Sequence, residues 1–76
     1  YEAAVVDAFF EVMTVIDAAK DIRDLYNLKG LRFEKLSGKR RAERSIRLNR
    51  QWRLIVQIEK DEQENVLLII DIEDYH

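Results

Sequence analysis

The spacing of apolar side chains changes once along this 76-residue chain, at Gly30, and the change limits the fold more than any other feature. From Ala3 to Lys20 the apolar residues recur at steps of three and four, which predicts an amphipathic helix over 3–20. After Gly30 they recur mainly at steps of two, which predicts strands. The chain is therefore expected to fold as an α+β domain.

The predicted helix has a broad apolar face. Its central residues are Val5, Phe9, Val12, Ile16 and Ala19, and it is widened by Val6, Phe10 and Met13. Such a face is buried only against a second layer of structure, so the helix needs a sheet to pack on. A short helical turn is expected to follow over 21–26, with Gly30 as the break before the strands.

Four extended segments follow the break, over about 31–36, 44–48, 52–59 and 66–72. The last segment is apolar on both faces until Asp71, which predicts a strand that is covered on both sides or central in the sheet. We expect a single domain over 1–76, in which an amphipathic N-terminal helix packs on a three- to four-stranded antiparallel sheet.

In the third segment, 52–59, alternation of residue types predicts which side chains lie on each face of the sheet. Trp52, Leu54 and Val56 alternate with Arg53, so Arg53 must lie on the face away from the helix, where it can meet side chains from the second strand and the chain end. Trp52 is interpreted as a core residue rather than a base-stacking platform, because its alternate neighbours are aliphatic.

Several functions are excluded by composition. The chain has no cysteine and one histidine, His76, so no disulfide or metal site is expected, and no cofactor is expected. Acidic residues interrupt the helical apolar stretch, and no signal peptide is recognisable, so we expect a cytoplasmic protein without a membrane segment.

The chain has a net charge of −2, but the charge is divided into an acidic block, a basic block and a second acidic block. Residues 1–28 carry two basic and six acidic side chains, and residues 54–76 carry one basic and seven acidic side chains. Residues 29–53 carry ten of the 13 lysines and arginines against two glutamates. This central block predicts a surface that attracts a polyanion, or else a solvated basic hairpin.

Four segments together carry a family resemblance: Leu31–Leu36, Arg44–Asn49, Gln51–Leu54 and the terminal Ile72–His76. They resemble the HigB-type toxins of the RelE/ParE superfamily, the plasmid maintenance killer proteins. The resemblance implies a RelE/ParE-like fold and a metal-independent endoribonuclease that cuts messenger RNA on the ribosome. It also implies a HigA-like antitoxin as partner, with operator DNA bound only through that antitoxin.

The resemblance implies a site built from distant segments. The arginine after the tryptophan contacts the scissile phosphate in this family, which carries over to Arg53, and the terminal Tyr75 and His76 carry over as base-orienting and proton-transfer groups. Lys35 or Lys39 would supply a further charge at the phosphate. The surrounding RNA contacts are expected from Arg40, Arg41, Arg44, Arg47 and Arg50. The acidic Asp71, Glu73 and Asp74 are interpreted as partners of this basic face.

The chain departs from the family pattern in three places. The family's turn lysine falls at Ser37, and some relatives have a histidine where this chain has Glu34, so catalytic strength is in question. The family's N-terminal strand and first helix are not represented, as in a fragment or a shortened variant. An uncovered sheet edge is then expected, with self-association, strand exchange or dependence on antitoxin.

Two other functions remain open at this stage. One is a ParE-like inhibitor of DNA gyrase. The other is a weakened module that only binds antitoxin and operator DNA, which Ser37 and the unrepresented N-terminal strand favour.

Overall fold

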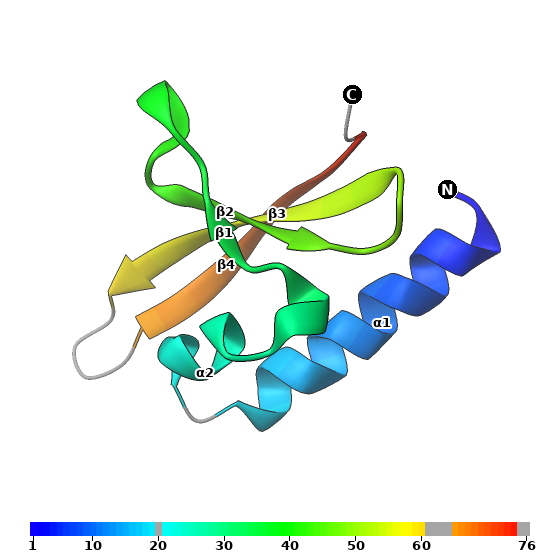
Figure 1. The fold of residues 1–76 in the computed structure, drawn as a ribbon, viewed down its shortest axis with the longest axis horizontal. Coiled ribbons are helices and arrows are strands. Elements are labelled where there is room, and N and C mark those ends of the chain that lie inside the picture. Colours follow the sequence, from blue (N-terminus) through cyan, green and yellow to red (C-terminus); the bar gives the residue numbers. More distant parts are fainter. Residues whose placement is uncertain (20, 61–64, 75–76) are drawn as a thin grey trace.

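The structure, a computed structural model, describes residues 1–19, 21–60 and 65–74. Two helices precede the sheet, α1 (Ala3–Ala18) and α2 (Ile22–Tyr26). The remaining elements are two 3-10 turns and four strands: η1 (Lys29–Leu31), β1 (Glu34–Lys35), η2 (Gly38–Arg40), β2 (Glu43–Arg47), β3 (Trp52–Lys60) and β4 (Asn65–Asp74). The expected α+β class, a helix on an antiparallel sheet, is confirmed (Figure 1).

Helix α1 buries a narrower face than the sequence predicts. Val5 and Val12 are buried, and the other predicted face residues, Phe9 and Ile16, are half-buried. The expected widening through Val6 and Phe10 is wrong, because these side chains are 40% and 62% exposed. The helix also ends at Ala18 rather than at Lys20, and Lys20 lies outside the described residues.

The first predicted strand, 31–36, is mostly wrong. Strand β1 contains only Glu34 and Lys35, because η1 occupies the start of the segment and Arg32 turns the chain with a left-handed φ of 47°. Leu31 and Phe33 alternate as a strand would require, but Leu31 is buried from η1 and Phe33 from the irregular residues before β1. Periodicity of two over such a short stretch does not distinguish these conformations.

The sheet has the order β1-β2-β3-β4, and all neighbouring strands are antiparallel. The expectation that the last strand is central or covered is therefore wrong, because β4 is an edge strand. Its consecutive side chains Leu68, Ile69 and Ile70 are 38%, 42% and 48% exposed. The two interior strands are instead buried on both sides, β3 at Leu54, Ile55 and Val56 and β2 at Ser45 and Ile46.

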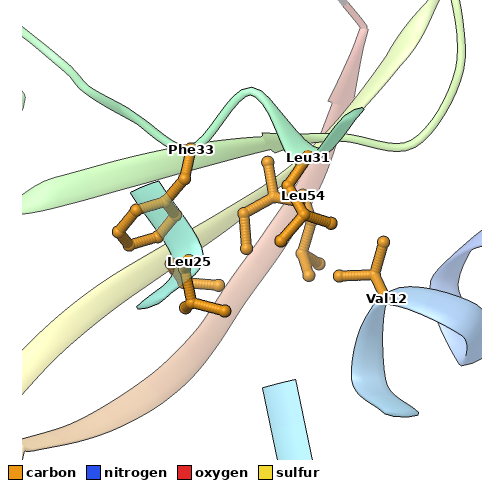
Figure 2. Close-up of a cluster of buried hydrophobic side chains, with 7 residues drawn as sticks. Val12, Leu25, Leu31, Phe33 and Leu54 are labelled. Atoms are coloured by element: carbon orange, nitrogen blue, oxygen red, sulfur yellow. The ribbon is translucent and has the colours of Figure 1, made fainter. Parts of the chain in front are cut away.

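The hydrophobic core lies between the helices and one face of the sheet. Figure 2 shows Val12 of α1, Leu25 of α2 and Leu54 of β3 gathered with Leu31 and Phe33 from the segment that joins α2 to β1. The β2 partner of Leu54 is Ile46, which is fully buried. We call this side of the sheet the helix face and the other side the open face.

Candidate functional site

The register of β2, β3 and β4 places a row of three charged residues on the open face. Arg53 lies opposite Arg47 on β2 and opposite Glu73 on β4. Two like charges directly opposite each other on neighbouring strands destabilise a sheet unless an anion lies near them. Glu73 supplies that anion, since its Oε1 lies 3.4 Å from Arg53 Nη2. The predicted position of Arg53, away from the helices and near the chain end, is confirmed.

A second arginine reaches the same glutamate from a different part of the chain. Arg40, in η2, donates from Nη1 to Glu73 Oε1 at 3.1 Å and from Nη2 to Glu73 Oε2. Its Nε and Nη2 also donate to Glu43 Oε1 at 3.2 and 3.0 Å. The four residues Arg40, Glu43, Arg53 and Glu73 form one connected cluster, which we call the Arg40 network.

The Arg40 network covers the centre of the open face. Glu43 is paired across the strands with Gln57, and Glu73 with Arg53. The guanidinium of Arg40 bonds both carboxylates, so it spans the row of cross-strand partners that lies between these two pairs. That row contains Ile55, which is fully buried although it faces away from the helices. Long side chains commonly cover apolar surface in this way while their charged ends remain near water.

The ion pairs change the titration of both partners. The hydrogen bonds from Arg40, followed by its charge and the contact with Arg53, lower the pKa of Glu73 despite partial desolvation. The hydrogen bonds to Glu73 and then to Glu43 raise the pKa of Arg40. Both shifts favour the charged forms, so Arg40 and Glu73 are both ionised at neutral pH.

The structure brings part of the predicted basic set to the open face. Arg40, Arg47 and Arg53 lie there, each half-buried. Arg47 donates from Nε to the carbonyl oxygen of Asn49 at 3.4 Å, at the end of β2. These three arginines come from η2, β2 and β3, so their convergence depends on the sheet register rather than on their spacing in the sequence.

Two predicted site residues lie on the other side. Arg44 is opposite Val56, on the helix face, and its Nε donates to the hydroxyl oxygen of Tyr26 in α2 at 3.0 Å. Lys35 is opposite Arg44, so its backbone position also assigns it to the helix face. The structure therefore does not bring Arg44 or Lys35 to the side of Arg53.

The other predicted residues are either exposed or outside the described part of the chain. Lys39 and Arg41 are exposed at and just after η2, and Arg50 is exposed in the bend between β2 and β3. Tyr75 and His76 lie outside the described residues, so their position relative to Arg53 stays a prediction.

Glu43 is the functional-site residue that the sequence did not identify. It is one of two glutamates in the basic block, and its three-residue spacing from Arg40 was the available signal. The predicted pairing of the terminal acidic residues with the basic face is confirmed for Glu73. Its neighbour Asp74 accepts a hydrogen bond from Gln51 Nε2 at 3.1 Å.

Two further observations concern the described residues alone. Over 1–19, 21–60 and 65–74, no group of three or more histidine, cysteine, aspartate or glutamate side chains is placed to hold a metal ion. In the same part of the chain, neither helix has the length and apolar character needed to cross a membrane.

Comparison with known proteins gives one match. The family model described as the RelE-like toxin of type II toxin-antitoxin system HigB matches residues 2–76, nearly the whole chain. No curated protein matches this chain, and no solved structure matches it.

Proposed function

Because this chain belongs to the HigB-like family of RelE-like type II toxins, we propose that it is a ribosome-dependent endoribonuclease that cuts messenger RNA without a metal ion. The observation that carries the proposal is the place of Arg53 on the open face, opposite Arg47 and beside Glu73. A guanidinium that is held at a sheet surface among other arginines has the geometry and permanent charge to bind a phosphate.

The chemistry assigns a role to Arg53. Metal-free cleavage uses the ribose 2′-hydroxyl as nucleophile, breaks the bond to the 5′-oxygen, and places extra negative charge on the phosphate oxygens. Arg53 would stabilise that charge as it develops. Tyr75 and His76 would orient the base and transfer the protons, and these two roles rest on the family resemblance.

Exposed cations around the open face would position the RNA. Lys39, Arg41 and Arg50 are exposed, and each contact with a phosphate would make binding more dependent on salt. The departure at Ser37, two residues before Lys39, favours Lys39 as the lysine that assists Arg53. Arg44 and Lys35 have a smaller part in this proposal because their register places them on the helix face.

The test is a cleavage map from cells that express the chain. We expect ribosome-dependent cuts in messenger RNA, and we expect Arg53→Ala to reduce them at least about hundredfold because transition-state charge is left without its main partner. Arg23→Ala is the matched control, since Arg23 is an exposed arginine in α2 that pairs with Asp21, and α2 packs on the helix face rather than on the side of Arg53.

Other results would support the competing functions. Gyrase-dependent DNA breaks without messenger RNA cuts would favour a ParE-like inhibitor. The absence of toxicity in a folded chain would favour a module that only binds antitoxin. Equal cleavage by wild type and Arg53→Ala would remove Arg53 from the mechanism.

The family implies an antitoxin partner, and we propose that it is HigA-like. We also propose that copies of the chain associate through the edge of β4, where unpaired backbone groups lie beside exposed Leu68, Ile69 and Ile70. Light scattering of the chain alone should show a dimer or larger species, and Ile70→Lys should shift it to monomer. A wild-type monomer at high concentration would contradict this proposal.

A further inference from the structure

Glu73 lies where an anion would be expected to bind. Its carboxylate accepts hydrogen bonds from two arginines of different elements, Arg40 in η2 and Arg53 in β3. A carboxylate and a phosphate present similar oxygen pairs to a guanidinium, so the donors that hold Glu73 are also suited to a phosphate. A phosphate diester approaching Arg53 therefore meets a position that is already filled.

We infer that Glu73 is a built-in competitor for RNA phosphate at Arg40 and Arg53, and that its release limits the affinity of the open face for nucleic acid. The inference rests on the proposed role of Arg53 as the phosphate-binding residue. It assigns Glu73 a regulatory function, in addition to its structural contribution to the Arg40 network.

The distances indicate which of the two arginine–Glu73 contacts a phosphate would break first. Glu73 is held by Arg40 through two donors, with 3.1 Å from Nη1 to Oε1, whereas Arg53 Nη2 lies 3.4 Å from Glu73 Oε1. A phosphate would therefore take Arg53 from Glu73 before it affects Arg40. The side chains of Arg53 and Glu73 are 22% and 27% exposed, so a ligand can reach the pair from solvent.

The chain offers a matched control for this inference. Asp71 lies two residues before Glu73 on β4 and opposite Ile55, so it is on the same face and carries the same charge. Its Oδ1 accepts from the backbone N–H of Ile72 at 2.8 Å, and an asparagine can accept the same bond. Asp71→Asn and Glu73→Gln both remove one negative charge, but only Glu73→Gln removes the competitor.

The experiment measures binding of a short, fluorescein-labelled 2′-O-methyl RNA, which lacks the nucleophile and is not cut. By fluorescence anisotropy, Glu73→Gln should bind about fivefold to twentyfold more tightly than wild type, whereas Asp71→Asn should gain no more than about twofold. The double variant Glu73→Gln with Arg53→Ala should lose the gain. A residue with only a structural role would give the opposite sign, since loss of the network would weaken binding.

Two outcomes would overturn the inference: Glu73→Gln binding no more tightly than Asp71→Asn, or the gain surviving in the double variant. If Glu73→Gln does not fold, carbon-13 NMR of wild type replaces it. The side-chain carboxyl signal of Glu73 must then move as the same RNA is added, and an unchanged signal with bound RNA overturns the inference.

The inference and the proposed function can fail separately. If Glu73→Gln binds RNA more tightly but the chain cuts no messenger RNA, the inference about Glu73 stands and the proposed nuclease function is wrong. Messenger RNA cleavage that depends on Arg53, together with equal binding by Glu73→Gln and Asp71→Asn, would do the reverse.

Discussion

Leu54 and Ile55 are neighbours on β3 and both are fully buried, yet they lie on opposite faces of the sheet under different kinds of cover. Leu54 packs against Val12, Leu25 and other aliphatic side chains, whereas Ile55 lies beneath the Arg40 network. Apolar packing responds little to salt or pH, but exposed ion pairs respond to both. The open face is therefore the side whose order depends on solution conditions and on bound anions.

The largest effect on stability is expected on the helix face. Leu54→Ala should lower the free energy of unfolding by about 3 kcal/mol, because it removes buried methyl groups and leaves a cavity among residues that cannot fully close it. Urea denaturation measures this loss, and the loss should be similar at low and high salt. A loss below about 1 kcal/mol would mean that this core is loosely packed.

Ile55→Ala sharpens the comparison. The substitution should lower the free energy of unfolding by about 2 kcal/mol at low salt, because the long side chains that cover Ile55 can move to fill part of the cavity. The cost should fall as salt rises, because screening weakens the ion pairs that keep Ile55 covered in the wild type. Equal salt dependence for Ile55→Ala and Leu54→Ala would show that the two covers do not differ as described.

On the open face, acid should act through Glu73. The folded-state pKa of Glu73 is below its ordinary value, so its contribution is complete above the ordinary pKa and is lost as pH falls through the folded value. Wild type should therefore lose stability below about pH 4.5 more steeply than Glu73→Gln. Glu73→Gln itself should cost no more than about 1 kcal/mol at neutral pH. Parallel pH profiles of unfolding for the two proteins would contradict this assignment.

A small, local effect is expected in the turn that carries Arg40. Gly38 has a φ of 66°, where a side chain is strained although the surrounding space is open. Gly38→Ala should cost about 1 kcal/mol. Gly30→Ala is its control, because Gly30 has neither a positive φ nor a neighbour within 4 Å of an added Cβ. Thermal denaturation should show a lower Tm for Gly38→Ala alone.

The sequence predicted the parts of the fold that depend on local pattern. The long period in α1 and the alternation in β3 gave the fold class and the face of Arg53 correctly. The family assignment came from the resemblance of four segments, and the family match confirms it. It failed for β4, because an apolar strand reads the same whether it is central or at an edge that exposes its side chains.

The candidate site was predicted less completely than the fold. Alternation along β2 is enough to separate Arg44 from Arg47, but which arginines of different elements come together depends on pairing register, and the sequence alone did not give that register. The glutamates were harder still to place. Glu43 and Glu73 are far apart in sequence, and only the folded turn brings Arg40 within reach of both.

A single guanidinium joins the segment after Ser37 to the last strand, across 33 positions of the chain. An anion strong enough to separate Arg40 from Glu73 would also break the link between β4 and this segment, which carries Lys39 and Arg41. Ligand affinity and the order of that segment are then thermodynamically linked, so a change in either one must alter the other.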